Sequence, residues 1–160
     1  MCLITSNYYH KKDNNRNVKC FVAEEDILVY KCLDCERGEF RTPFQYMPIT
    51  FKRGKYIYTK VNMKKKAFYN EMSEGAYVES GIHAYRTMIR ALAVSKSFYD
   101  YNGTYMHYAV IPKGSNFYIG KNDDIVSNNL IVYRDKKYFD KDYENIIDIS
   151  DYIVKYIKAE

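Results

Sequence analysis

The sequence predicts an α+β fold, a compact and mostly antiparallel β-sheet domain with two or three helices. Three observations indicate this class. Short β-rich segments separated by turn residues run through most of the 160 residues, apolar residues recur at helical spacing in two places, and the 3 prolines and 7 glycines form no linker. With 47% hydrophobic residues, the chain buries enough surface for a single core. We expect one domain over residues 1–160, with a mobile segment at 1–20 and a C-terminal helix at 140–160.

The first half of the chain predicts strands and a hairpin. Residues 26–33 are rich in β-branched and aromatic side chains and are typical of a buried strand. Two prolines favour an extended backbone at 41–51, and the turn at 52–55 leads into a second β-rich run at 56–61. The charged run at 64–72 is compatible with a short helix.

The second half begins with a strand that runs directly into a helix. Residues 81–85 are β-rich, and Thr87 is a suitable N-cap for the helix that follows. That helix ends before the Asn102–Gly103 turn. Its apolar residues at helical spacing are Met88, Ile89, Leu92, Ala93 and Tyr99.

Three further strands and a terminal helix complete the prediction. The strands are expected at 105–111, 117–119 and 125–133, with a turn at 112–115. Isoleucines then recur at helical spacing near the C-terminus, accompanied by two tyrosines, and predict an amphipathic helix. These residues are Ile146, Ile149, Ile153 and Ile157, with Tyr152 and Tyr156.

Charge and hydropathy limit the partners. The chain carries 25 basic and 20 acidic residues, a net charge of +5. Its basic clusters at 11–12, 64–66 and 136–137 are scattered along the sequence, so we expect no sequence-specific nucleic-acid binding. The sequence contains no run of 18 apolar residues and no apolar signal segment at its start, so we expect a cytoplasmic protein without membrane contact.

Four cysteines raise two alternatives, neither of which we favour. Cys32 and Cys35 have the spacing of half a zinc site, but a second closely spaced pair is missing. Cys2 would become an N-terminal nucleophile if Met1 were removed, yet the polar run at 11–17 follows it closely. We expect reduced Cys2, Cys20, Cys32 and Cys35, with neither a metal nor a cofactor.

Several short motifs together resemble a family of short uncharacterised proteins of tailed phages and gut bacteria. They are MCLIT at 1–5, AEEDILVYK at 23–31, TPF at 42–44, GKY at 54–56, GIHAY at 81–85 and IPKGS at 111–115. The resemblance implies a viral or mobile-element setting, in an infected or host bacterial cell. It implies no particular chemistry.

A more distant resemblance does imply chemistry. VYK at 29–31, GIHAYRT at 81–87 and PKGS at 112–115, followed by VSNNLI at 126–131, resemble in order and spacing the motifs of the ADP-ribosyltransferase fold. The resemblance implies a split-sheet domain with a nucleotide cleft. In that family an arginine engages phosphates, a serine motif orients the nicotinamide, and a glutamate stabilises charge on the ribose.

This chain departs from that pattern at each position. Lys31 replaces the arginine, His83 and Tyr85 replace hydroxyl residues, and residues 127–129 supply no carboxylate. Loss of such electrostatic stabilisation removes most of the rate. What the resemblance then implies is a cleft that holds a nucleotide without breaking it. The candidate ligand-binding residues are Tyr30, Lys31, His83, Tyr85, Arg86, Ser127, Asn128 and Asn129.

Three classes of function remain open. The first is a catalytically inert, phage-encoded protein that binds or sequesters a nucleotide, for example a host defence signal. The second is an enzyme that acts on a nucleotide or ADP-ribosyl substrate, with His83 and His107 meeting across the sheet as acid and base. The third is a structural or protein-interaction module. A homo-oligomer is compatible with each of them.

Overall fold

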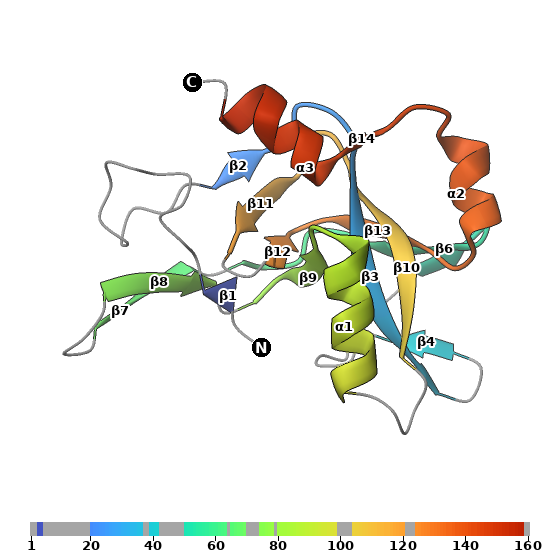
Figure 1. Cartoon of the computed structure of the whole chain (residues 1–160), viewed down its shortest axis with the longest axis horizontal. Helices are drawn as coiled ribbons and strands as arrows, with labels where there is room; N and C mark the ends of the chain where they lie inside the picture. The colour runs from blue at the N-terminus through green and yellow to red at the C-terminus, as the bar shows by residue number, and fades with distance from the viewer. Residues whose placement is uncertain are drawn as a thin grey trace.

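The computed structural model describes a mixed α+β protein with an open, mostly antiparallel sheet and three helices (Figure 1). The α+β prediction is therefore confirmed. The described backbone covers residues 3–4, 20–36, 39–41, 50–63, 65–69, 74–78, 80–98, 104–120 and 124–158. Side chains are described for residues 20–33, 50–63, 78, 80–93, 105–120 and 124–158. The segment predicted to be mobile at 1–20 lies outside these residues, apart from 3–4 and Cys20.

The large sheet has the strand order β2-β11-β12-β9-β3-β10-β13-β6-β5, and β4 and β14 also pair with β3. Its pairs are antiparallel except for the parallel pair of β14 with β3. Its strands are β2 (Phe21–Val22), β3 (Ile27–Glu36), β4 (Glu39–Arg41), β5 (Thr50–Lys52), β6 (Lys55–Tyr58), β9 (Ile82–Tyr85), β10 (Thr104–Ile111), β11 (Asn116–Ile119), β12 (Asp124–Ser127), β13 (Leu130–Tyr133) and β14 (Ile147–Asp148).

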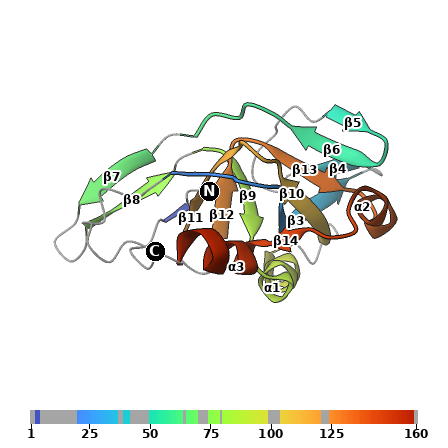
Figure 2. The same ribbon diagram turned by 90° about the horizontal axis from the view of Figure 1, so that it is seen from above.

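A smaller sheet contains β1 (Leu3–Ile4), β8 (Glu74–Val78) and β7 (Lys65–Tyr69), in that order. Its β7–β8 ribbon extends from one side of the molecule (Figure 2). The short helix considered for 64–72 is therefore wrong at 65–69, and the other residues of that run lie outside the described ones. The run of charges there presents no apolar stripe that a helix would bury, and pairing with β8 satisfies the backbone instead.

Three helices border the large sheet. They are α1 (Met88–Phe98), α2 (Lys136–Asp142) and α3 (Ile149–Tyr152), and α3 continues as a π-helical turn, η3 (Ile153–Ile157). The C-terminal helix expected at 140–160 begins only at Ile149, because Ile147 and Asp148 pair with β3. The Asp148 carboxylate then caps α3 by accepting a hydrogen bond of 2.9 Å from the Asp151 amide.

The sheet has apolar side chains on both faces. Alternate residues of β3 point in opposite directions, so Val29 and Leu33 enter the main core, which also contains residues of α3. Cys32 lies on the other face, which α1 and α2 cover (Figure 1). Lys31 therefore lies on the main-core face, between Val29 and Leu33.

Helix α1 starts as expected but buries a different face. Thr87 caps it by accepting a hydrogen bond of 3.1 Å from the Arg90 amide. Ala91 is fully buried against the sheet, whereas Ile89 is 81% exposed and Leu92 is 39% exposed. The expected apolar stripe is therefore wrong in phase for Ile89 and Leu92, because Ala91 is the residue that packs with Tyr85 and Cys32 of the sheet. Tyr99 of that stripe lies outside the described residues.

The strand expected at 125–133 is divided into two. A turn at Asn128 and Asn129 ends β12, which pairs with β9 and β11, and starts β13, which pairs with β10 and β6. The chain thus moves between separate parts of the sheet within two residues. Of the hairpin expected over 41–61, the part at 50–58 is confirmed by the pairing of β5 with β6, and residues 42–49 lie outside the described ones. Strands β3, β10 and β11 confirm the strands expected at 26–33, 105–111 and 117–119.

Candidate functional site

Two of the predicted site residues are joined across neighbouring strands. The Lys31 ammonium on β3 donates a hydrogen bond to the main-chain carbonyl of His83 on β9. Lys31 is only 5% exposed and lies among apolar residues, so burial lowers the pKa of its ammonium to about 8. This is a buried cation with one neutral acceptor among the described residues.

Tyr30 and Tyr85 form a second pair on the opposite face. They are direct neighbours across β3 and β9, and they pack with Cys32 and Ala91 beneath α1. The Cys32 thiol donates a hydrogen bond of 3.0 Å to the Ala91 carbonyl in the same cluster. The tyrosine side chains thus contribute to a packed layer between the sheet and α1.

Arg86 lies at the end of β9, outside the layer in which Tyr30 and Tyr85 pack. Its Nε donates a hydrogen bond of 3.1 Å to the Ser150 hydroxyl at the start of α3. Arg86 therefore connects the β9–α1 junction to the C-terminal helix.

Ser127, Asn128 and Asn129 hold the turn between β12 and β13. The Ser127 hydroxyl donates to the Asn129 carbonyl at 2.9 Å, and Asn128 Oδ1 accepts from the Asn116 amide at 2.9 Å. Asn129 Oδ1 accepts from the Lys60 amide at 2.8 Å. These side chains bind neighbouring backbone, as Asn and Ser commonly do in turns.

The predicted site residues are therefore divided between two faces and both ends of β9. Tyr30, His83 and Tyr85 lie on one face of the sheet, while Lys31 lies on the other. Ser127 pairs with Ile82 at the start of β9, whereas Arg86 follows its end. The structure brings Lys31 next to the His83 backbone and Tyr30 next to Tyr85, and it separates these two pairs.

His83 and His107 do not meet, contrary to expectation. His107 on β10 pairs with Lys31, so strand β3 lies between the two histidines, and their side chains point to opposite faces. His107 Nδ1 lies 3.0 Å from the Tyr133 carbonyl and 3.1 Å from the Arg134 carbonyl, so it carries the proton. Burial lowers the pKa of this imidazole. This role is structural.

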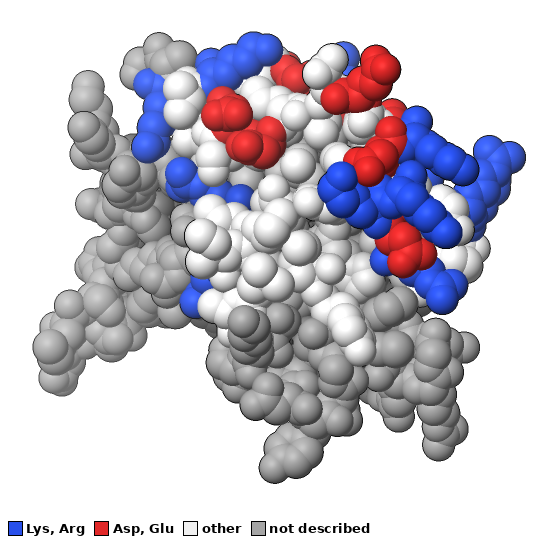
Figure 3. Space-filling model, turned by 45° about the vertical axis from the view of Figure 1, so that its right-hand side comes forward, with Lys and Arg blue, Asp and Glu red and all other residues white. Residues whose placement is uncertain are grey.

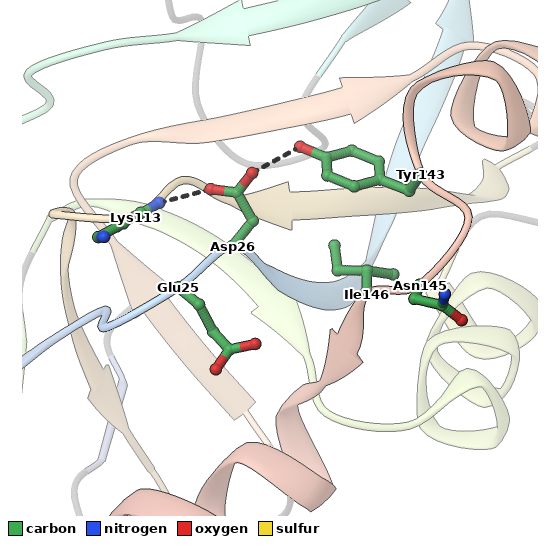
Figure 4. Close-up of a pocket in the computed structure, with 6 residues that line it drawn as sticks. All are labelled: Glu25, Asp26, Lys113, Tyr143, Asn145 and Ile146. Carbon is green, nitrogen blue, oxygen red and sulfur yellow. Dashed lines mark hydrogen bonds between the residues drawn. The ribbon is translucent and has the colours of Figure 1, made fainter.

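A separate cavity of about 300 Å³ lies where two of the sequence motifs meet (Figure 4). Glu25 and Asp26 come from the motif at 23–31, and Lys113 comes from the turn of the motif at 111–115. Segment 143–146, between α2 and β14, supplies the other side. The lining residues are Glu25, Asp26, Lys113, Tyr143, Asn145 and Ile146.

Asp26 fixes this cavity by binding both of its sides. One carboxylate oxygen accepts a hydrogen bond of 2.8 Å from the Lys113 main-chain amide, and the other accepts one of 3.0 Å from the Tyr143 hydroxyl (Figure 4). Burial, followed by the hydrogen bond to Asp26, raises the pKa of Tyr143 to about 12. Tyr143 thus remains a neutral hydroxyl that donates to Asp26.

Glu25 is held from the side of the C-terminal helix. Its Oε2 accepts hydrogen bonds from the Tyr156 hydroxyl and, at 3.2 Å, from the Lys155 ammonium. These contacts lower the pKa of the carboxyl group, with the bond from Tyr156 as the largest cause. Glu25 therefore stays ionised and leaves Oε1 as an acceptor at the cavity.

Three polar groups of the cavity are available to a ligand. The described contacts give no hydrogen-bond partner to the Lys113 ammonium, the Asn145 amide or Glu25 Oε1, and the Lys113 charge attracts the Glu25 carboxylate. Tyr143 and Ile146 add apolar surface. The six lining residues include no histidine, cysteine or serine that would act as a nucleophile or a general base. The arrangement suits binding by hydrogen bonds and one positive charge.

The sequence offered a partial signal for this cavity. Glu25, Asp26 and Lys113 lie in motifs that stand out in the chain, yet none of them was among the candidate ligand-binding residues. Asp26 supplies a carboxylate just before a strand, and the Pro-Lys-Gly turn at 112–114 supplies main-chain amides that can donate to such an acceptor. Nothing local marks Tyr143, Asn145 and Ile146.

The comparisons with known proteins assign no family. No protein-family model matches the chain, and no curated protein or solved structure is significantly similar to it. Among the described residues, no helix is long and apolar enough to cross a bilayer. The same residues contain no cluster of three metal-binding side chains.

Proposed function

We propose that this protein binds a mononucleotide without transforming it, in the cavity formed by Glu25, Lys113 and Asn145. The observation that carries the proposal is the meeting of two separate sequence motifs at one cavity whose polar groups are preset by Asp26. A volume of about 300 Å³ is at the small end of ligand sites, which suits one nucleoside.

The chemistry of the lining supports a nucleotide. A side-chain amide both donates and accepts, and a carboxylate oxygen accepts, so Asn145 and Glu25 match the donors and acceptors on the edge of a base. Tyr143 and Ile146 offer apolar surface to the ring. The Lys113 ammonium pairs with a phosphate. Because two carboxylates lie nearby, a single phosphate is favoured over a triphosphate.

The absence of turnover is part of the proposal. Residues 127–129 carry no carboxylate, and their side chains already bind the turn backbone. We infer that the chain shares ancestry with the ADP-ribosyltransferase-like split sheet that its motifs resemble, without the transferase reaction. Together with the similarity to phage proteins, it leads us to infer a protein that sequesters a host nucleotide signal.

Calorimetry tests the proposal directly. The full chain is titrated with adenosine, guanosine, their 5′-monophosphates, a cyclic monophosphate and ATP. We expect one-to-one binding of a monophosphate that exceeds binding of ATP, with the ligand recovered unchanged by chromatography. Absence of binding to every compound, or consumption of the ligand, would overturn the proposal.

Two variants locate the site. Asn145→Ala should weaken binding of both the nucleoside and its monophosphate, by about tenfold for one lost hydrogen bond. Lys113→Ala should weaken binding of the monophosphate alone. Lys60→Ala, an exposed lysine outside the cavity, is the matched control and should bind as the unmodified chain does. Equal effects of the Lys60 and Lys113 changes would place the ligand elsewhere.

A further inference from the structure

Five exposed cations that are scattered in the sequence lie on one side of the folded chain. They come from the end of β5, the β5–β6 turn, the segment before α2 and α2 itself. Figure 3 shows Lys and Arg (blue) gathered on one side of the molecule, with Asp and Glu (red) among them. We refer to them as the basic surface, which consists of Lys52, Arg53, Arg134, Lys137 and Lys141.

The β5–β6 turn is fixed against α2 by backbone geometry. Arg53 and Gly54 both have positive φ, at 52° and 74°, as a two-residue hairpin turn requires. The Gly54 carbonyl accepts a hydrogen bond of 2.9 Å from the Arg134 amide, and the Tyr138 ring packs directly on Gly54. The turn therefore holds Lys52 and Arg53 next to the cations of α2.

The charges of the basic surface are not neutralised within the described residues. The two ion pairs of this region use other lysines: Lys55 pairs with Asp142, and Lys136 pairs with Asp140 at 3.0 Å. Of the carboxylates at 134–142, only Asp135 is left outside these pairs. Five cations against the single carboxylate of Asp135 leave this surface with a net positive field toward solvent.

We propose that the basic surface binds nucleic acid through its phosphates, without sequence preference. A protein partner would be expected to use exposed apolar anchors, and the exposed side chains of this surface are charged. Phe51, 51% exposed on the edge strand β5, packs on Tyr56 with ring centroids 4.9 Å apart and points to the other face of the sheet from Lys52, so it lies outside this surface. A positive surface of this kind attracts the phosphate backbone of a nucleic acid whatever its base sequence.

This surface is separate from the proposed mononucleotide cavity and does not depend on it. None of its five residues lines the cavity. The mononucleotide proposal and the nucleic-acid proposal can therefore fail independently. The two double variants described below are assayed for both kinds of binding.

Fluorescence anisotropy with a labelled oligothymidylate of about 16 nucleotides tests the surface. We expect binding that weakens steeply between about 50 mM and about 200 mM salt. The Lys137→Glu/Lys141→Glu variant should lose about tenfold or more in affinity, and the slope of log affinity against log salt should fall by about 2.

The matched control is Lys60→Glu/Lys158→Glu, which changes the net charge equally but lies outside the basic surface. It should keep most of the affinity, and both double variants should keep mononucleotide binding. If both double variants lost the same affinity for the oligonucleotide, net charge alone would explain the binding, and the proposal would be overturned. Absence of binding at low salt, or tighter binding of polyglutamate than of the oligonucleotide, would also overturn it.

Discussion

The ammonium of Lys31 donates a hydrogen bond to the carbonyl of His83, within the main core of the sheet. A lysine at this depth is unusual because its charge loses hydration and gains only a neutral acceptor. Its pKa of about 8 is a consequence of that burial. Because burial lowers this pKa, the free energy of unfolding should rise with pH as the ammonium loses its proton.

The pH dependence of stability should therefore differ between the unmodified chain and Lys31→Met. Since the folded-state pKa of Lys31 is about 8 and its usual value is 10.5, the unfolded chain holds more protons between these values, and stability rises with pH there. Relative to Lys31→Met, the free energy of unfolding should increase by about 2 kcal/mol from pH about 7.5 to about 10. Urea denaturation at several pH values measures it, and parallel profiles would contradict it.

Asp26 should contribute more to the free energy of unfolding than Asp140, an exposed aspartate on α2. Asp26→Ala removes the acceptor of the Lys113 amide and of the Tyr143 hydroxyl, and we expect a loss of about 2 kcal/mol. Asp140→Ala, which removes only the exposed ion pair with Lys136, should lose about 0.5 kcal/mol or less. Urea denaturation of both variants provides the comparison. Losses of similar size would mean that Asp26 does not hold the cavity together.

Two glycines with positive φ should respond differently to alanine. Gly54 and Gly114 have φ of 74° and 87°, so both changes introduce backbone strain of about 1 kcal/mol. A Cβ on Gly54 would also collide with the Tyr138 ring, whereas a Cβ on Gly114 meets open space. Thermal unfolding should therefore show a larger loss for Gly54→Ala, by about 1–3 kcal/mol. A smaller loss for Gly54→Ala than for Gly114→Ala would contradict the packing of α2 on the turn.

Helix α1 offers a test of which face it buries. Ala91→Leu should destabilise the protein by about 1–3 kcal/mol, because Ala91 is fully buried against the sheet. Ile89→Ala on the same helix should change stability by less than about 0.5 kcal/mol, since Ile89 is 81% exposed. Chemical denaturation distinguishes the two. A larger loss for Ile89→Ala than for Ala91→Leu would mean that α1 buries the face that the apolar spacing predicts.

The local features of the chain were predictable where they depend on neighbouring residues. The strand at β3, the hairpin at β5–β6 and the Thr87 cap of α1 follow from β-propensity, turn residues and an N-cap hydroxyl, which act within a few residues. The buried face of α1 was not predictable in this way. Apolar spacing alone does not reveal that Ala91 faces the sheet and that Ile89 faces solvent.

The α+β class and the strand that enters a capped helix at residues 82–88 were predictable from the amino acids, because short-range backbone preferences set both. Tertiary packing set the other features. It divided 125–133 at Asn128, since the two halves pair with different strands, and it placed Asp26 beside Lys113, 87 residues away. It also gathered the basic surface, because side chains distant in sequence become neighbours only when strands and helices pack.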